Sequence, residues 1–450
     1  MFERPAEGEN AVLVAVEFRA SHNHDLNEFS ELALSAGANI VEVMHIRRDV
    51  PDPRYFVGSG KVEQLAALIK ASHVDLVLFD HQLSPAQERN LENTLKCRVI
   101  DRTRLILDIF AQRARSFEGK LQVELAQLEH QSTRLIRGWT HLERQKGGIG
   151  MRGPGETQLE SDRRIIRQRI KQINARLDKV RTQRHQSARA RRRAYLSVAS
   201  LVGYTNAGKT TLFNRLTSAA AYAADQLFAT LDTTLRRIDV PGEHPVLLSD
   251  TVGFIRDLPP ELIAAFQATL EETQDATVLL HVIDASAADR EEHILEVERT
   301  LTRIGAGDKP VIQVFNKIDR VEGGVAKIDR NSNGDAKAVW VSAQTGAGIN
   351  LLLEAIAEHL DRTKERFMLL LAPKDGRARA KLYELGAVID ETLTEEGGWN
   401  LEITMSSGRW ESLSRDLGVS DVEIRPLNID LEQVTEISST GNPVETHRDA

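Results

Sequence analysis

The sequence predicts an α/β protein with four parts: a parallel α/β domain, a long antiparallel helical hairpin, a second and larger α/β domain, and a small α/β domain. Three observations predict this order. Short apolar runs alternate with helical patterns, apolar residues recur at spacings of four and three in one central stretch, and a glycine-rich segment follows an apolar strand. The length of 450 residues suits about three domains.

Residues 1–112 carry the first α/β pattern. Apolar runs typical of strands lie at residues 12–18, 40–46, 74–80 and 97–100. Helical patterns lie between them, near residues 26–36, 60–71 and 84–95. Strands that alternate with helices in this way predict a parallel sheet flanked by helices.

Residues 113–195 are typical of a coiled-coil hairpin. Its two apolar seams are Leu121, Leu125, Leu128, Ser132, Leu135, Trp139 and Leu142, then Leu159, Arg163, Ile166, Ile170, Ile173, Leu177 and Val180. A tip at residues 146–156 joins the helices, because its five glycines and one proline do not continue a helix. We expect Thr157 to cap the second helix, which reaches roughly 55 Å at 1.5 Å per residue.

The hairpin is basic, although the whole chain has a net charge of −8. Between Arg113 and Arg193 there are 21 lysines and arginines and eight acidic residues, a net charge of +13, and the remainder carries −21. These cations form either a solvated face or an RNA-binding surface. The hairpin's length favours RNA, because a long arm buries little core. The candidate contacts are Lys146, Arg152, Arg163, Arg164, Arg167, Arg169 and Lys171.

Residues 196–363 form the second α/β domain, and residues 364–427 form the small one. In the small domain we expect strands at 367–372, 399–406 and 422–427 and a helix near 376–393. The polar tail, 428–450, is typical of a disordered segment.

A phosphate-binding loop is the strongest motif of the second domain. GYTNAGKT (203–210) follows an apolar strand and opens an apolar-periodic helix. Its backbone N–H groups and the helix N-terminus favour phosphates. We expect Lys209 to reach the outer phosphates and the Thr210 hydroxyl to bind Mg²⁺. The predicted contacts here are Gly203, Tyr204, Thr205, Asn206, Ala207, Gly208, Lys209, Thr210 and Thr211.

Two further segments complete the predicted phosphate and magnesium contacts. In DTVGF (250–254), Asp250 is expected to hold Mg²⁺ through a water and the Gly253 N–H to bond the γ-phosphate. In FATLD (228–232), Thr230 is the chosen switch threonine, although spacing alone leaves Thr233 and Thr234 open. The predicted contacts are Thr230, then Asp250, Thr251, Val252 and Gly253.

The base-recognition motif is NKID (316–319). The Asp319 carboxylate accepts two donors from guanine, a pairing that adenine lacks. Asn316 supports the loop, the Lys317 stem covers the ring, and the Ala343 N–H meets the guanine oxygen. The predicted contacts are Asn316, Lys317, Ile318 and Asp319, then Ser342, Ala343 and Gln344. Together these motifs predict a P-loop GTPase that binds GTP and GDP and hydrolyses GTP.

Phe254 stands where many GTPases carry a water-orienting glutamine, and its side chain has no polar group. We expect it to pack in the core, and we expect slow intrinsic turnover that a partner accelerates. No catalytic side chain is therefore assigned with certainty. Asn206 either braces the phosphate loop or helps to hold K⁺ between phosphates.

These motifs resemble those of the HflX family, ribosome-associated GTPases of the Obg-HflX group of translation-factor-related GTPases. GYTNAGKT, FATLD, DTVGF and the tip GGIGMRGPGE carry the resemblance, which runs from about residue 12 to 427. It implies that Thr230 is the switch threonine and that residues 228–232 contact the nucleotide, namely Phe228, Ala229, Thr230, Leu231 and Asp232. It also implies binding to the large ribosomal subunit and its RNA, and GTP-dependent splitting or rescue of stalled ribosomes.

Two other functions stay open. One is a GTP-gated RNA-binding factor for large-subunit assembly. The other is an ATP-driven RNA remodeller, because GSGK (58–61) is a glycine-rich turn before a helix, although it lacks the rest of a phosphate-loop pattern.

Composition excludes other classes of protein. The single cysteine, Cys97, excludes an intramolecular disulfide, and no apolar stretch is long enough to span a membrane. The N-terminus lacks a signal-peptide pattern. We expect a cytoplasmic monomer.

Overall fold

The computed structural model describes residues 8–18, 26–139, 154–193, 197–217, 227–228, 230, 234–241, 246–256, 262, 273–362, 365–394, 396–405, 410, 413–414, 417 and 424–426. The chain forms two compact units. The first comprises Met1–Arg191 and Leu196–Ala357, and the second comprises Arg192–Tyr195 and Glu358–Ala450.

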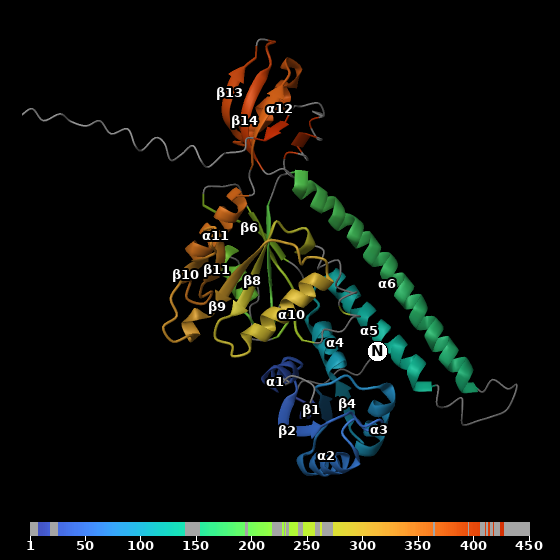
Figure 1. Ribbon diagram of the computed structural model, residues 1–450. Coiled ribbons are helices and arrows are strands. Elements are labelled where there is room, and N and C mark those ends of the chain that lie inside the picture. Colours follow the sequence, from blue (N-terminus) through green and yellow to red (C-terminus); the bar gives the residue numbers. More distant parts are fainter. Residues whose placement is uncertain are drawn as a thin grey trace, which may run out of the picture. The chain divides into compact units, whose positions relative to one another are not determined.

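The first unit begins with a four-stranded parallel sheet of order β2-β1-β3-β4 (Figure 1). Its strands are β1 (Asn10–Phe18), β2 (Asn39–Arg48), β3 (Leu76–Phe79) and β4 (Arg98–Asp101). Its helices are α1 (Leu26–Ser35), α2 (Ser59–Ser72), α3 (Pro85–Leu95) and α4 (Arg102–Arg113). The predicted parallel sheet with flanking helices is confirmed.

Both faces of this sheet are covered, which explains the unbroken apolar runs of its strands. Leu13 of β1 belongs to a core cluster with Phe29 of α1, whereas Val14 belongs to a cluster with Leu65 of α2. The sequence pattern did not reveal α4. Its residues 102–103 and 105–110 are all buried, so the helix shows no polar face to mark its period.

The hairpin consists of α5 (Phe117–Trp139) and α6 (Pro154–Arg193). The predicted seam is present in its described part, where one cluster joins Leu121, Leu125 and Leu128 to Ile170, Ile173 and Leu177. The second helix begins at Pro154 and not at Thr157. Proline suits a first helical position, because the N–H that it lacks has no partner there. Residues 140–153, with Lys146 and Arg152, lie outside the described residues.

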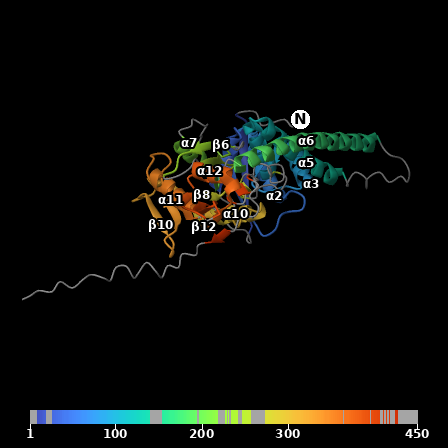
Figure 2. The same ribbon diagram turned by 90° about the horizontal axis from the view of Figure 1, so that it is seen from above.

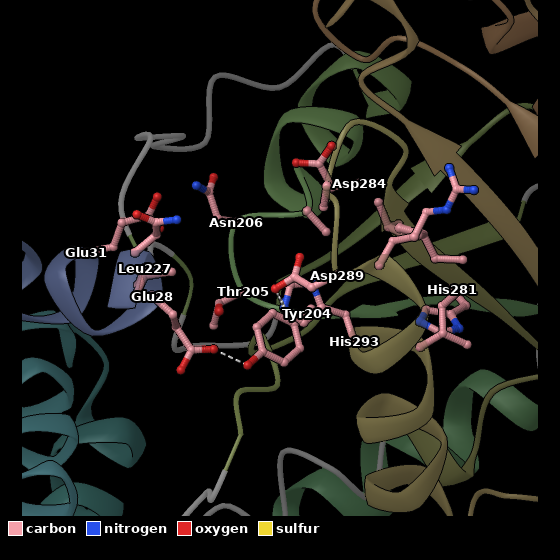
Figure 3. Close-up of a pocket in the computed structure, with 17 residues that line it drawn as sticks. Glu28, Glu31, Tyr204, Thr205, Asn206, Leu227, His281, Asp284, Asp289 and His293 are labelled. Carbon is pink, nitrogen blue, oxygen red and sulfur yellow. Dashed lines mark hydrogen bonds and ion pairs between the residues drawn. The ribbon is translucent and has the colours of Figure 1, made fainter. Parts of the chain in front are cut away.

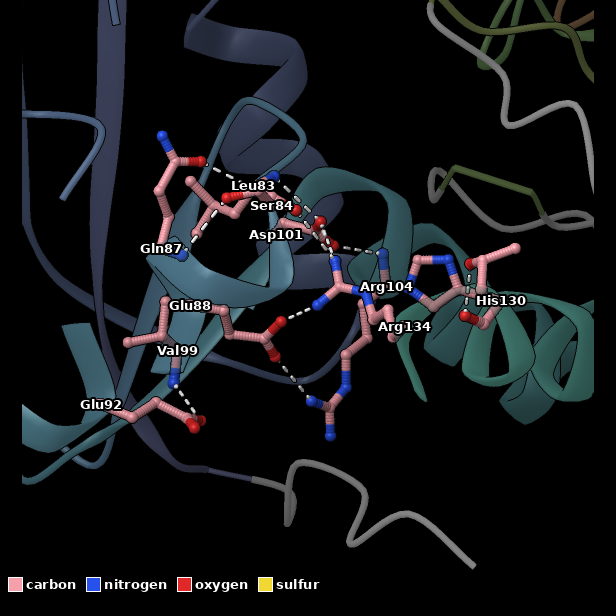
Figure 4. Close-up of polar contacts among 11 residues, drawn as sticks. Leu83, Ser84, Gln87, Glu88, Glu92, Val99, Asp101, Arg104, His130 and Arg134 are labelled. Atoms are coloured by element: carbon pink, nitrogen blue, oxygen red, sulfur yellow. Dashed lines mark hydrogen bonds and ion pairs between the residues drawn. The ribbon is translucent and has the colours of Figure 1, made fainter. Parts of the chain in front are cut away.

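Charged side chains anchor the hairpin to the first sheet (Figure 4). Arg134 of α5 forms ion pairs with Glu88 of α3 and with Asp101, the N-cap residue of α4. Asp101 is 1% exposed and also accepts hydrogen bonds from the Leu83 and Arg104 N–H groups, at 3.2 and 2.9 Å. Burial raises the pKa of the Asp101 carboxyl above its ordinary value. The cluster therefore ties α3, α4 and α5 together.

The second sheet has seven strands in the order β10-β11-β9-β8-β5-β7-β6, and only its edge strands β10 and β6 are antiparallel to their neighbours. The strands are β5 (Val198–Gly203), β6 (Thr234–Ile238), β7 (Val246–Asp250), β8 (Val278–Asp284), β9 (Val311–Asn316), β10 (Lys327–Arg330) and β11 (Ala336–Trp340). The helices are α7 (Lys209–Thr217), α10 (Arg290–Arg303), the 3₁₀ helix η1 (Ile318–Arg320) and α11 (Ile349–Arg362). Helices α7 and α10 lie on opposite sides of the sheet (Figure 2).

The second unit carries a four-stranded antiparallel sheet of order β13-β14-β12-β15. Its elements are β12 (Glu365–Leu371), the 3₁₀ helix η2 (Pro373–Asp375), α12 (Gly376–Glu384), β13 (Val388–Leu393), β14 (Trp399–Met405) and β15 (Ile424–Pro426). The helix predicted near 376–393 is wrong in its second half. Gly386 adopts a φ of 62°, which ends the helix, and the following residues pair with β14. The tail 428–450 lies outside the described residues.

None of the helices within the described part of the chain is both long and apolar enough to cross a bilayer.

Candidate nucleotide-binding site

The predicted motifs meet around one cavity at the carboxyl ends of the strands β5, β7, β9 and β11. Ligands of open α/β sheets bind at this edge. The cavity has a volume of about 390 Å³. Its lining consists of Thr205, Asn206, Gly208, Lys209, Thr210, Thr211, Phe228, Thr230, Thr251, Gly253, Asn316, Lys317, Asp319, Arg320, Ala343 and Gln344.

The phosphate loop needs its glycines. Gly203 and Gly208 have φ angles of 150° and 90°. A Cβ atom on Gly203 would lie 2.3 Å from the Val282 carbonyl oxygen, and one on Gly208 would lie 2.3 Å from Nδ2 of Asn316. The loop therefore runs too close to β8 and to the NKID segment for any larger residue.

Lys209 lies at the bottom of the cavity and is 6% exposed. Its Nζ donates to the carbonyl oxygens of Gly203 and Tyr204, at 3.0 and 2.7 Å. Burial lowers the pKa of Lys209 to about 8, against the opposing effect of the Asp250 carboxylate. An incoming anion at this place would restore the charged form.

The three predicted magnesium residues lie together. Oδ2 of Asp250 accepts hydrogen bonds from the Thr210 and Thr230 hydroxyls, both at 2.9 Å, and the two hydroxyl oxygens are 2.5 Å apart. Oδ1 of Asp250 is buried without a hydrogen-bond partner, and burial raises the pKa of this carboxyl. A buried carboxylate oxygen with two adjacent hydroxyls fits a hard divalent cation such as Mg²⁺.

Thr230 is thus the threonine whose hydroxyl lies at this cluster. Thr234 lies in β6, where it pairs in register with Asp250, and Thr233 lies outside the described residues. Ala229, Leu231 and Asp232 also lie outside them.

Asn316 connects the two halves of the cavity. Its Nδ2 donates to the Ala207 carbonyl oxygen at 2.9 Å, and its Oδ1 accepts from the Ala343 N–H at 2.9 Å. The phosphate loop and residues 342–344 are therefore joined through one side chain. Asp319 accepts a hydrogen bond from the Ser342 hydroxyl.

Two residues that sequence reasoning missed also hold this end of the site. Asp284 at the end of β8 forms an ion pair with Lys317 at 2.7 Å, which keeps the pKa of Asp284 below its ordinary value. Arg215 of α7 donates to the carbonyl oxygens of Ala343, at 3.1 Å, and Gln344. Asp284 ends an apolar strand, and this position in the sequence could have identified it as a site residue. No sequence pattern identifies Arg215.

Several predicted contact residues have side chains that face away from the cavity. Val252 and Ile318 are buried, at 6% and 3% exposed, and are not among the residues that line the cavity. The Phe228 ring packs against Phe110 of α4, with ring centroids 4.6 Å apart, although Phe228 also lines the cavity. Tyr204 lines a different cavity.

Phe254 occupies the position at which many GTPases carry a water-orienting glutamine. It is 3% exposed, and its backbone pairs with the phosphate loop through Thr205 N–H to Phe254 O at 2.8 Å and Phe254 N–H to Gly203 O at 3.1 Å. The expectation that it packs in the core is met.

On α6 of the hairpin, which we also call the arm, Arg164, Arg167 and Lys171 are exposed, and Arg163 is half-buried. Arg169 forms an ion pair with Glu124 of α5 at 2.7 Å, so part of its charge is used within the hairpin. At the N-terminus of α2, the Arg48 guanidinium packs against Gly58, and Lys61 donates to Gln64 on its own helix.

Comparisons with known proteins match most of the chain. Family models match residues 23–111 (GTP-binding GTPase N-terminal), 113–192 (GTP-binding GTPase Middle Region) and 198–317 (50S ribosome-binding GTPase). GTPase HflX of Escherichia coli (strain K12) is 55% identical over 416 residues, which cover 92% of this chain and 98% of that protein. The chain belongs to the HflX family of GTPases.

Two further proteins are also similar to this chain. GTPase HflX of Caldanaerobacter subterraneus subsp. tengcongensis is 43% identical over 397 residues, 88% of this chain and 91% of that protein. A solved GTP-binding protein from Sulfolobus solfataricus in complex with GDP is 22% identical, covers 78% of this chain and 98% of that chain, and has a TM-score of 0.41. As a member of the HflX family the chain binds guanine nucleotides and hydrolyses GTP.

Proposed function

We propose that this GTPase binds the large ribosomal subunit through its basic hairpin and separates stalled ribosomes into subunits in the GTP state. Hydrolysis then serves for release. The observation that carries the proposal is the exposed row of Arg164, Arg167 and Lys171 on a helix of about 60 Å, on the opposite side from its apolar seam. The match of residues 198–317 to a family described as 50S ribosome-binding supports the same partner.

Within the cavity we assign the phosphates to the Gly203–Thr210 loop and to Lys209. Asp319 recognises guanine, and the Ser342 hydroxyl orients its carboxylate. Thr210, Thr230 and Asp250 would hold Mg²⁺, Asp250 through a water. The bound ion would neutralise charge at the phosphates. The Gly253 N–H is the sensor of the γ-phosphate.

Phe254 is buried and its side chain has no polar group to orient water, so we expect slow turnover until a partner binds. Asn206 is a candidate K⁺ ligand. It adopts a left-handed φ of 59° within the phosphate loop and lines the nucleotide cavity.

A test of the K⁺ assignment compares GTP turnover in KCl and NaCl at equal ionic strength. We expect faster turnover in KCl, and we expect Asn206→Ala to remove the difference. Equal rates in the two salts for the unaltered protein would refute the assignment.

Sedimentation tests the proposed ribosomal activity. Purified 70S ribosomes are mixed with the protein and a non-hydrolysable GTP analogue, with GDP as the control. We expect conversion to separate subunits with the analogue alone. Binding that is confined to immature large-subunit particles would instead indicate an assembly factor and would overturn the splitting activity.

A further inference from the structure

Two charged side chains hold the base end of the nucleotide cavity, the end that NKID and residues 343–344 line. Asp284 pairs with Lys317 at 2.7 Å, and it also lines a separate cavity of about 160 Å³ beside the phosphate loop (Figure 3). Arg215 bonds residues 343 and 344. Of these two side chains, Arg215 is the one that lies on α7, the helix that begins at the phosphate loop.

The guanidinium of Arg215 donates to two successive backbone carbonyls. Its Nε donates to the Ala343 oxygen at 3.1 Å, and its Nη2 donates to the Gln344 oxygen. A Cβ atom on Gly346 would lie 3.7 Å from Cζ of Arg215, so the segment after Gln344 also passes close to the guanidinium. Because the donors of arginine form a rigid planar fork, the two bonds fix the orientation of both carbonyls.

These bonds determine where the N–H groups of the segment point. In a trans peptide the carbonyl and the N–H point in opposite directions. The bond from Arg215 to the Ala343 oxygen therefore turns the Gln344 N–H away from α7. Ala343 and Gln344 both line the nucleotide cavity, so the segment presents backbone donors there.

Helix α7 connects the base end to the phosphate loop. The helix begins at Lys209, and Arg215 lies six residues further along, a rise of roughly 9 Å. Asn316 forms a second connection, because it bonds the Ala207 oxygen and the Ala343 N–H, both at 2.9 Å. Movement of residues 343–344 away from the phosphate loop would have to break both connections.

We propose that Arg215 is a positioning residue for guanine recognition. It holds residues 342–344 so that their N–H groups meet the carbonyl oxygen of guanine, and it thereby slows the release of GDP. Arg215 itself is not among the residues that line the cavity, so it acts through the backbone that it holds. This inference rests on the assignment of guanine to Asp319 proposed above.

The test measures the Kd and the dissociation rate of GDP in Arg215→Met and Arg215→Lys. We expect both quantities to rise about fivefold in Arg215→Met, the effect of one lost hydrogen bond to the base. Arg215→Lys should be nearly as weak, because an ammonium group keeps the charge but does not supply the planar fork. The kcat at saturating GTP should stay within about twofold, since the groups assigned to the phosphates and Mg²⁺ are unchanged.

A sulfur analogue makes the test specific to the guanine carbonyl. In 6-thio-GDP a sulfur replaces the carbonyl oxygen and accepts hydrogen bonds weakly, whereas both donors to Asp319 remain. We expect the unaltered protein to bind GDP about fivefold more tightly than 6-thio-GDP, and Arg215→Met to bind the two about equally. A general loss of stability would instead weaken the binding of both ligands by the same factor.

The matched control is Arg303→Met. Arg303 is an exposed arginine at the end of α10, in the same domain, and the same side-chain change is made there. Its affinity for GDP and for 6-thio-GDP should equal that of the unaltered protein.

Three results would overturn the positioning role. The first is an unchanged GDP affinity in Arg215→Met. The second is full affinity in Arg215→Lys, which would reduce the role of Arg215 to its charge. The third is the same preference for GDP over 6-thio-GDP in Arg215→Met as in the unaltered protein.

Asp319→Asn separates this inference from the proposed function. If Asp319→Asn kept its preference for guanine, the assignment of guanine to Asp319 would be refuted. If Asp319→Asn lost that preference while Arg215→Met bound GDP normally, only the role of Arg215 would be refuted.

Discussion

At the scale of single residues, the surroundings in the fold change the chemistry of ordinary side chains. Lys209 is buried and its pKa falls to about 8, while the pKa of the buried Asp250 rises. Burial therefore disfavours the charged forms of Lys209 and Asp250 in the protein without nucleotide. A bound polyphosphate with its cation would favour these charged forms. The nucleotide site is therefore suited to bind the charges of a polyphosphate and its cation, which the chain itself does not supply.

The pKa of Lys209 predicts how nucleotide affinity depends on pH. The charged form binds phosphate, and binding raises the pKa of the group, so the complex holds more protons than the free protein. GTP affinity should fall by about tenfold per pH unit above about pH 8. Titration calorimetry in buffers of different ionisation enthalpy checks this, because proton uptake should appear near pH 9 and vanish near pH 6. Affinity independent of pH from 7 to 10 would contradict it.

The Asp319 carboxylate predicts the base preference. In Asp319→Asn the amide offers a donor as well as an acceptor, which suits xanthine, whereas guanine offers two donors. We expect the preference for guanine over xanthine nucleotides to change by about 100-fold or more. Competition binding measures it, with the exposed Asp308→Asn as the control that keeps the guanine preference.

At the scale of elements, strand ends and helix starts place the chemistry. The strands β5, β7, β9 and β11 all end at one edge of the sheet, so motifs far apart in sequence meet there. The hairpin is placed differently, because a buried ion-pair cluster at Asp101 ties α5 to α3 and α4. We expect these directional contacts to help fix the orientation of α5.

Arg134→Met is expected to loosen the attachment of α5. It leaves the buried carboxylate of Asp101 without its arginine partner, and such a loss costs about 3–5 kcal/mol. Amide hydrogen exchange in α5 should accelerate on the order of 10²–10³-fold. Arg299→Met is the control, because its ion pair with Glu296 is 70% exposed at the arginine and contributes little. Unchanged exchange in α5 would show that the ion pairs do not hold the helix.

At the scale of the whole molecule, charge is separated along the chain. The segment from Arg113 to Arg193 carries +13 and the remainder carries −21. Because RNA is repelled by the acidic remainder of the protein, we expect the proposed contact with RNA to be restricted to the hairpin.

Charge reversal on the arm should weaken ribosome binding and its dependence on salt. In Arg164→Glu, Arg167→Glu and Lys171→Glu combined, we expect the slope of log K against log salt to lose about two to three units. Reversal of three exposed arginines elsewhere, Arg299, Arg303 and Arg377, should leave the slope unchanged. The slopes are measured from subunit binding at several KCl concentrations. An unaltered slope for the arm variant would show that the arm does not contact the ribosome.

The sequence by itself determined the α/β class, the hairpin seam and the nucleotide motifs. Each of these depends on local periodicity or on residue types at short spacing, such as Gly203 to Thr210, and short-range pattern is enough to specify them. The seam at Leu125 and Ile173 is an example, because a period of 3.5 residues already implies which side chains meet.

Tertiary structure alone decided what depends on contacts between distant segments. Residues 102–103 and 105–110 of α4 are all buried, so its sequence has no polar face to mark the helical period. Val388–Leu393 is a strand because it pairs with β14. It also brought Glu28 to Tyr204, 176 positions apart in the chain. Such contacts follow from packing and strand pairing between whole elements, and no local window of residues contains that information.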